Sequence, residues 1–545
     1  MYTMKTTLGS LLLFCVFRVG LSQDVFSPEQ RMNWLAKAEA SKPMLIETVK
    51  TPQRMVSLKQ NAQAWQGWEA VEAGDMETFY QTSLKKQPEI VVDFGEHLTG
   101  YFSCTLDLIG ISESDAPTRL KFTFGEVPSE LATPFDPYPG SLSRAWLQDE
   151  IVTIEYVPET VHIPRRVSFR YLKIEILGNS NNFDYKISEM AVKATTSAKV
   201  VPETLATGTP SMIADIDRVG LATLRECMQT VYEDGPKRDQ RLWIGDLYLE
   251  ALANTYSYRN HDLTKRCLYL LAGLAAPNGF LHATVFEKPN PHPQTGQHIL
   301  DYSLLYNVAL LDYLKVTDDR ETAVDLWPVA VQQIEIARTY LGTDLLYNQR
   351  PIWIFFDWRD NFDKLASLQG LFVKVLKDTY ELAKMIGKEK EVTGLPELAR
   401  QMSSTARKNY YDSTRGIVVS GQQKQISYLS QVWMALGGVL NKKEAQKALK
   451  TAMSMKDAVY PGSPYGNHYV VEALITCGME QEAKDYLIEY WGGMVSKGAD
   501  TFWEIYDPGN DTLSPNKFFP VNSYCHAWSC TPVYFIRKYP DIFQR

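Results

Sequence analysis

Carboxylates lie beside tryptophans at several places in this sequence, and that pairing suits chemistry on sugars. The densest cluster, residues 233–246, holds four acids, three cations and Trp243 between two helix-like patterns. Ion pairs on a solvent-exposed loop are the simplest explanation for the charges, and such pairs contribute little to stability. That explanation does not account for the tryptophan among them.

A second cluster surrounds Glu504, which lies between Trp503 and Tyr506. Apolar neighbours raise the pKa of a carboxyl group and suit it to act as a general base, so we expect a raised pKa for Glu504. The alternative is a surface glutamate beside a core tryptophan.

Two shorter clusters repeat the pattern. His526 and Trp528 lie in the segment 524–529, which we expect to open the last helix, and Asp357 precedes Trp358 in a loop. A single histidine is more often a core or capping residue than a catalytic one. Both clusters are therefore candidates only in combination with the first two.

Signatures of other enzyme chemistries are absent from the sequence. It has no G-x-S-x-G elbow, P-loop or H-E-x-x-H motif, and its cysteines form no C-x-x-C pair. His292 and His298 have no partner pattern, so we predict neither a metal site nor a cofactor. Acid–base cleavage of a glycosidic bond needs two carboxyl groups, and aromatic faces can hold the sugar. The clusters supply both.

Helices must position these clusters. From residue 211 onward apolar residues recur at helical spacing, which predicts twelve helices near 213–232, 246–259, 262–274, 299–316, 321–341, 363–386, 391–411, 425–438, 441–453, 465–476, 479–490 and 522–537. This number is typical of an (α/α)6 barrel, in which six helical hairpins close into a ring. Loops at one end of the inner helices then form a concave acidic cleft, where the clusters would meet.

The preceding part of the chain is strand-like. Leu120, Phe122 and Phe124 alternate with polar residues, as in a half-buried strand. In 167–176 the apolar alternation changes parity near Tyr171, which indicates either a bulge or burial on both faces. We predict three segments: a signal peptide at 1–22, a β-sandwich accessory domain at 23–200 and an (α/α)6 catalytic domain at 201–545.

The N-terminus has the pattern of a secretory signal peptide, with Lys5 before a short apolar run at 11–17 and small residues near 20–22. A lipoprotein signal would instead use Cys15, but the residues before it make a poor lipobox. We expect an exported protein, periplasmic or extracellular. Its remaining cysteines could form a disulfide in an oxidising compartment or stay as buried thiols.

Charge and composition limit the partners. Lys and Arg total 56 against 64 Asp and Glu, a net charge of −8, which argues against a nucleic-acid partner. No stretch after the N-terminus is long and apolar enough to span a membrane. The predicted partner is a carbohydrate, and the sequence does not indicate an oligomeric state.

At this point the chain resembles a known family. It is similar to the catalytic domain of the α-L-rhamnosidases of glycoside hydrolase family 78, because four motifs recur in the family's order: Asp234-x-Pro236-x-Arg238-Asp239 with Trp243-x-Gly245-Asp246, then Asp357-Trp358, Trp503-Glu504 and His526-Ala527-Trp528-Ser529. The resemblance covers residues 200–545, and the β-domain before them matches the family's usual β-sandwich companion. It implies an (α/α)6 barrel and inverting hydrolysis of a terminal rhamnose or related sugar.

The resemblance also implies roles for single residues. Glu504 would be the general base. The pocket for the cleaved sugar would be lined by residues that bind its hydroxyls and its methyl group: Asp234, Arg238, Trp243, Asp246, Trp358, Trp503 and His526.

The chain departs from the family at the general acid. The family motif reads Arg-Asp-Glu-Arg, and Gln240 stands where its acidic glutamate would be. A carboxamide can hydrogen-bond the glycosidic oxygen but cannot protonate it. The loop is also one residue shorter before Trp243, so another acid could take the vacated place. Asp239 and Asp246 are the candidates, and Asp246 is favoured because it opens the next helix, although it could be only an N-cap.

Two alternatives remain open. One is a carbohydrate-binding relative that keeps the pocket but has lost its acid at Gln240. The other is a different (α/α)6 enzyme, such as a polysaccharide lyase, which would use His526 as a base near Arg238.

Overall fold

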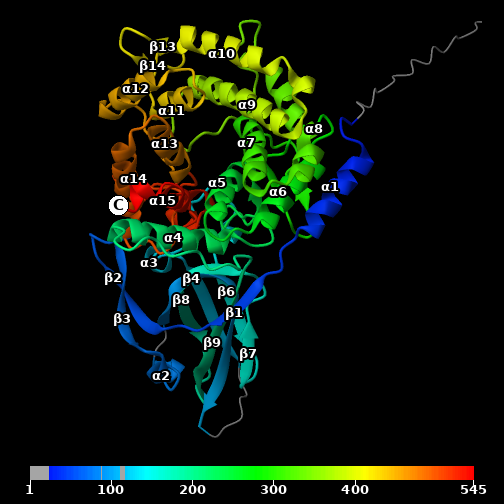
Figure 1. The fold of residues 1–545 in the computed structure, drawn as a ribbon. Coiled ribbons are helices and arrows are strands. Elements are labelled where there is room, and N and C mark those ends of the chain that lie inside the picture. Colours follow the sequence, from blue (N-terminus) through cyan, green and yellow to red (C-terminus); the bar gives the residue numbers. More distant parts are fainter. Residues whose placement is uncertain (1–23, 87–88, 111–116) are drawn as a thin grey trace, which may run out of the picture.

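The computed structural model describes residues 24–86, 89–110 and 117–545 (Figure 1). A β-domain is followed by a ring of helices, which confirms the predicted fold class. The expected signal peptide and the lipoprotein alternative at Cys15 lie outside the described residues. No described helix is both long and apolar enough to cross a membrane.

The β-domain is built on nine antiparallel strands in one sheet, with β1-β9-β4-β8-β5-β6 in order and β2, β3 and β7 beside this path. The strands are β1 (Ile46–Lys50), β2 (Arg54–Gln60), β3 (Trp68–Asp75), β4 (Glu89–Ile109), β5 (Thr118–Gly125), β6 (Asp149–Ile154), β7 (Glu159–His162), β8 (Val167–Gly178) and β9 (Asp184–Thr196). The long β4 pairs with β8 along its first half and with β9 and β7 along its second. It thereby connects the strands on its two sides into one hydrogen-bonded path.

The predicted strand patterns hold in detail. Leu120, Phe122 and Phe124 on β5 are buried in the domain core. On β8 three consecutive residues, 167–169, are buried before Tyr171, so both faces are covered there, whereas only Leu172 and Ile174 are buried after it. A register shift also occurs opposite this point, on β4 between Asp93 and Leu98.

The helical domain alternates outer and inner helices around a ring. The outer helices are α4 (Ser211–Cys227), α6 (His261–Gly273), α8 (Arg320–Arg338), α10 (Leu395–Tyr410), α12 (Lys442–Ser454) and α14 (Glu480–Ser496). The inner helices are α5 (Ile244–Thr255), α7 (Leu300–Thr317), α9 (Leu365–Ile386), α11 (Tyr428–Leu436), α13 (Pro464–Thr476) and α15 (Pro532–Lys538). Consecutive inner helices pack on one another, and α15 closes the ring against α5. A short α16 (Pro540–Phe543) follows.

The predicted last helix is wrong in its first half. We expected a helix at 522–537, but α15 begins only at Pro532. The preceding backbone is held by long-range hydrogen bonds: Glu504 N–H donates to Ser523 O at 2.9 Å, and His526 N–H donates to Phe502 O at 2.9 Å. These contacts bury the apolar residues that suggested a helix.

One helix in the range expected for the β-domain belongs elsewhere. α1 (Pro28–Ala40) is capped by Ser27 and packs on α6, where Trp34 is fully buried. Arg31 donates hydrogen bonds to the carbonyls of Ala275 (2.5 Å) and Ala276 (2.9 Å). The six described cysteines are all free and buried, and Cys227 and Cys525 approach to 4.0 Å between sulfur atoms.

Candidate active site

A cavity of about 220 Å³ brings the sequence clusters together. Its walls come from the loops before α5, α7 and α9, from the first turns of α5 and α7, from the segment 504–528 and from one loop of the β-domain. The lining residues are Leu142, Asp234, Arg238, Asp239, Arg241, Trp243, Asp246, Gln294, Gln297, Ile299, Tyr302, Trp353, Phe355, Trp358, Glu504, Asn516, His526 and Trp528. Glu504 therefore shares one cavity with the 234–246 segment, as the barrel hypothesis required.

Asp234 shapes the loop before α5. Its carboxylate accepts backbone hydrogen bonds from Asp239 (3.1 Å) and Arg241 (3.2 Å). Leu242 and Trp243 then form strand β10, which pairs with β11 (Thr284–Phe286) and fixes where α5 begins. The loop is thus held at both ends, and several of its side chains enter the cavity.

Glu504 is held as a carboxylate. It forms an ion pair with the Arg238 guanidinium and accepts a hydrogen bond from Ser523 N–H at 3.2 Å. Burial favours the neutral acid, but Arg238, His526 and the Ser523 N–H outweigh it and lower the pKa of Glu504. The expectation of a raised pKa was wrong, because the cationic partners of Glu504 lie far away in the sequence.

Asp246 and His526 form a second polar pair. The Asp246 Oδ1 and His526 Nε2 atoms are 3.4 Å apart. Burial raises the pKa of Asp246, whereas the neighbouring carboxylates raise the pKa of His526 against the opposing effect of burial. Asp246 lies in the first turn of α5, and Trp243 occupies the N-cap position, so Asp246 is not the N-cap.

The wall carries polar atoms that the protein leaves unpaired. Among the described residues, His526 Nδ1 and Trp358 Nε1 are buried and have no hydrogen-bond partner, and the 3.4 Å contact between Asp246 Oδ1 and His526 Nε2 is too poorly aligned to satisfy either atom. Buried polar atoms without partners are costly, and they are rare unless a ligand or water completes them. Their convergence on one cavity is suited to binding hydroxyl groups.

Two other acids complete the cavity. Burial, together with the charges of Asp239 and Asp246, raises the pKa of Asp234 to about 8. Asp239 is the more accessible carboxylate, with 14% of its side chain exposed against 2% for Asp246. It forms ion pairs with Arg238 (3.3 Å) and Arg241 (3.0 Å).

Aromatic rings form the rest of the wall. Phe355 stacks on Trp528 with 5.7 Å between ring centroids, and Trp358 meets Phe355 edge-on at 5.1 Å. The sequence reasoning included Trp243 and Trp358 but missed Phe355 and Trp353. The aromatic-rich run 353–358 was the signal that could have found them.

Two predicted site residues lie outside this cavity. Trp503 is buried away from it and stacks on Trp65 of the β-domain, with 4.1 Å between centroids. Gln240 lines a different cavity, and its amide donates to Pro236 O at 2.8 Å. Glu504 and Asp239 therefore enter the cavity while their chain neighbours Trp503 and Gln240 do not; residues 236–239 form a turn, and Gln240 after it has a positive φ of 59°.

Other missed residues carry no sequence signal. Leu142 comes from the β-domain, and Gln294, Gln297 and Asn516 come from loops of ordinary composition. Only the packing of distant segments brings them to the cavity.

Comparison with known proteins assigns both parts of the chain. Residues 52–194 match the glycosyl hydrolase family 78 alpha-rhamnosidase N-terminal domain, and residues 206–539 match the bacterial alpha-L-rhamnosidase six-hairpin glycosidase domain. No curated protein matches the sequence.

Solved structures agree with this assignment. A rhamnosidase from Klebsiella oxytoca with rhamnose bound is 38% identical, with a TM-score of 0.90 over 93% of this chain and 99% of that one. A family 78 rhamnosidase of Bacillus sp. GL1 shares the fold at 21% identity and a TM-score of 0.67, over 82% of this chain and 46% of its own. The chain belongs to the α-L-rhamnosidases of glycoside hydrolase family 78 and is a glycoside hydrolase.

Proposed function

We propose that the protein releases terminal α-L-rhamnose or a related sugar from an oligosaccharide or polysaccharide, by hydrolysis with inversion. The observation that carries this proposal is the single cavity shared by Glu504, Asp239 and Asp246 within aromatic walls. Two carboxyl groups with different surroundings are what inverting hydrolysis requires. The related Klebsiella oxytoca enzyme is described with rhamnose bound.

Glu504 is the proposed general base. Its lowered pKa keeps it ionised, so that it can take a proton from a water molecule attacking the sugar. Arg238 and Ser523 N–H orient the carboxylate, since both contact its Oε2 atom. The other carboxylate oxygen is left to face the attacking water.

Asp239 is the proposed general acid. In an enzyme that removes terminal sugars, the glycosidic oxygen faces the mouth of the pocket, where the rest of the substrate leaves. The greater exposure of Asp239 supports this position for it, whereas Asp246 is nearly inaccessible and lies beside His526. We therefore assign Asp246, His526 and Asp234 to the sugar hydroxyls, with Trp243 and Trp358 contacting the sugar's apolar face and methyl group.

The binding-only alternative rested on the loss of an acid at Gln240. The Gln240 side chain points into another cavity, and Asp239 lines the proposed site instead. The substitution of glutamine therefore does not remove an acid from this cavity, which supports catalysis.

Hydrolysis of a panel of aryl glycosides and rhamnosylated oligosaccharides tests the proposal. We expect rhamnose to be released from α-L-rhamnosides, initially as the inverted anomer by NMR, and Glu504→Gln to reduce kcat at least about 100-fold. Equal rates for wild type and Glu504→Gln would exclude Glu504 as the base.

A series of leaving groups separates the two acid candidates. Without its general acid the enzyme needs a leaving group that departs unprotonated, so Asp239→Asn should keep most activity on dinitrophenyl rhamnoside and lose it on poor leaving groups. Asp246→Asn should lose activity on both alike. The reverse pattern would make Asp246 the acid.

We also propose that the protein is exported, on the sequence pattern of residues 1–22 alone. Cell fractionation and N-terminal sequencing of the mature chain test this. A cytosolic chain that keeps these residues would exclude it.

A further inference from the structure

A second cavity of about 280 Å³ lies against the β-domain. Its lining contains four cations, two aromatic rings and no carboxylate: Tyr101, Ala145, Trp146, Gln148, Pro164, Arg165, Arg166, Lys237, Gln240 and Lys288. A cavity that combines aromatic faces with positive charge is suited to a sugar that carries an anionic group.

This cationic cavity adjoins the active-site cavity, because three loops line both. In the β-domain loop, Leu142 faces the active site and Trp146 faces the cationic cavity. In the loop before α5, residues 238–239 and 241 face the active site, while Lys237 and Gln240 face the cationic cavity. The loop after β11 contributes Gln294 to one and Lys288 to the other. Residues of the same loops thus line both cavities.

The acids that pair with these cations lie behind the cavity wall. Arg166 Nη2 contacts Glu233 at 2.6 Å, and Arg165 Nε contacts Glu150 at 2.5 Å. Neither glutamate lines the cavity. Arg166 Nε is buried and has no hydrogen-bond partner among the described residues. Arg165 also donates to the carbonyls of Ala145 (3.2 Å) and Leu147 (2.9 Å). Both arginines are thus fixed in place, and each guanidinium has more N–H donors than partners.

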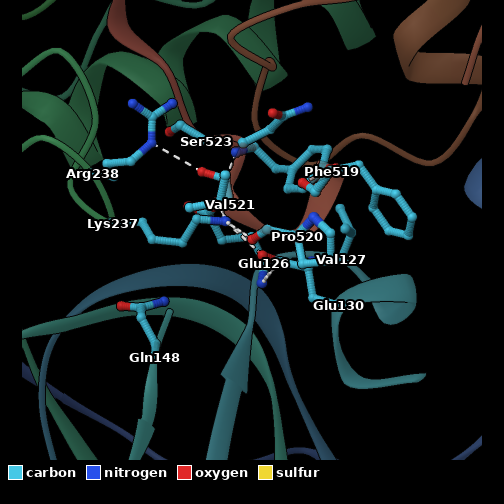
Figure 2. A network of polar contacts seen from close by, with 12 residues as sticks. Glu126, Val127, Glu130, Gln148, Lys237, Arg238, Phe519, Pro520, Val521 and Ser523 are labelled. Carbon is cyan, nitrogen blue, oxygen red and sulfur yellow. Dashed lines mark hydrogen bonds and ion pairs between the residues drawn. The ribbon is translucent and has the colours of Figure 1, made fainter. Parts of the chain in front are cut away.

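Lys237 is held more fully, because Glu126, Glu130 and the Pro520 carbonyl (3.3 Å) all surround its Nζ atom and leave no donor for a ligand. Its Nζ atom contacts Glu126 (3.0 Å) and Glu130, both of the β-domain and both outside the cavity lining (Figure 2). Lys288, which also lines the cavity, is exposed. The cavity therefore combines an exposed cation, Lys288, with a buried one, Lys237.

We propose that the cationic cavity binds an anionic group, a carboxylate or a sulfate ester, on the sugar to which the cleaved rhamnose is attached. This inference rests on the proposed function and specifies its substrate as an acidic glycan. Trp146 and Tyr101 would pack on the sugar ring, and Arg165, Arg166 and Lys288 would bind the anion.

Three matched disaccharides test the inference. Each carries terminal α-L-rhamnose, and the second sugar has a hydroxymethyl group, a carboxylate or a 6-sulfate at the same position. We expect kcat/KM to be about tenfold higher for an anionic disaccharide than for the neutral one at low ionic strength, and the difference to shrink in about 0.5 M NaCl. Whichever anionic disaccharide reacts faster identifies the group that the cavity takes.

Variants connect this preference to the cavity. Arg165→Gln and Lys288→Gln should each bring the anionic-to-neutral ratio towards one, because each removes one positive charge. Lys456→Gln removes an exposed charge outside both cavities and should leave the ratio unchanged. A wild-type ratio near one, or a preference that survives both cavity variants, would overturn the proposal.

Calorimetry separates the two proposals. If no disaccharide is hydrolysed, the proposed function fails. Titration of the carboxylate disaccharide into wild type and into Lys288→Gln still measures how tightly the cationic cavity binds the disaccharide. Weaker binding to Lys288→Gln than to Lys456→Gln would support the cationic site. Equal binding, or none to the wild type, would exclude it. Hydrolysis of all three disaccharides at equal rates would instead support the proposed hydrolase function and exclude the role of the cationic cavity.

Discussion

Several acidic side chains in the active-site cavity are buried more deeply than an isolated charged group would tolerate. Asp234, Asp246 and Glu504 lie within one cavity, and all are nearly inaccessible. Each has a different solution: backbone donors for Asp234, His526 for Asp246 and Arg238 for Glu504. Environment rather than residue type thus separates the carboxylate that stays ionised from those that favour a proton.

Glu250 is a further buried carboxyl group close to these acids. It lies one turn after Asp246 on α5, it is fully buried, and neither carboxyl oxygen has a hydrogen-bond partner among the described residues. Burial and the nearby Asp246 and Asp234 raise its pKa well above 4.5. The folded protein therefore keeps this carboxyl group protonated at pH values where the unfolded chain ionises it.

We predict that Glu250→Gln makes stability less dependent on pH. The raised pKa means that the folded state binds the extra proton, so the wild-type free energy of unfolding falls as pH rises above about 4.3, by up to about 1.4 kcal/mol per pH unit until the folded-state pKa is reached. Glutamine does not ionise, so the variant lacks this pH-dependent contribution to the free energy of unfolding. Urea unfolding at pH 5 and pH 7 should show the variant gaining stability relative to wild type at the higher pH. An exposed Glu77→Gln control should show no such gain, and parallel pH profiles for Glu250→Gln and wild type would contradict the prediction.

At the scale of elements, periodicity predicted most helices because each buries a face along its own length. The amphipathic pattern of α10 and the alternation on β5 are local properties of the sequence. The segment 522–531 is apolar for a different reason: it pairs with residues 502–504 through backbone hydrogen bonds. Nothing local distinguishes this kind of burial from helical burial, so the last helix was predicted too long.

The same limit explains the errors within the candidate site. The sequence indicated both Glu504 and Arg238 but not the ion pair between them, and it placed Trp503 beside the sugar because Trp503 is adjacent to Glu504. In extended backbone adjacent side chains point to opposite sides. Trp503 therefore faces the β-domain, where it stacks on Trp65. Contacts between distant segments decide such details, and no local pattern contains them.

We predict that Trp65→Ala destabilises the protein and slows the proposed reaction. Trp65 belongs to the short helical turn η1 (Trp65–Gly67), is 7% exposed and packs against both Trp503 and Tyr506. Removing a buried tryptophan costs about 3–5 kcal/mol. Urea unfolding should show a loss of this order, and kcat on an aryl rhamnoside should fall because Trp503 fixes the backbone that carries Glu504. Tyr156→Ala, at a 62% exposed position, is the control and should change neither; an unaltered unfolding midpoint for Trp65→Ala would show that the stack is dispensable.

At the scale of the whole molecule, the β-domain positions the catalytic loop. Its buried Glu126 accepts a hydrogen bond from Tyr524 N–H at 2.6 Å and pairs with Lys237 at 3.0 Å (Figure 2). Arg238 and Ser523 are the two residues that hold Glu504. Lys237 directly precedes Arg238, and Tyr524 directly follows Ser523. Buried charge at the domain boundary is thus connected to the proposed base through two backbone neighbours.

The charges in this cluster are interdependent. Burial favours the neutral acid, but Lys237 and His97 hold the pKa of Glu126 at about 2. His97 Nε2 lies 3.1 Å from Glu126 Oε1, and both side chains are nearly inaccessible. Removing one member of such a cluster leaves the others buried without compensation, which costs about 3–5 kcal/mol.

We therefore predict that Glu126→Gln lowers the free energy of unfolding by about 3 kcal/mol or more and that Lys237→Met in the same chain restores part of the loss. The recovery is expected because methionine removes a buried cation that Glu126→Gln deprives of one of its two carboxylate partners, and it is only partial because Glu130 then loses Lys237. Urea unfolding of the wild type, the two single variants and the double variant measures the coupling. If the double variant loses the sum of the single losses, Glu126 and Lys237 act independently, and the β-domain only covers the barrel. A coupling of about 1 kcal/mol or more, with kcat falling in Glu126→Gln at saturating substrate, would show that the β-domain holds the base in place through buried charge.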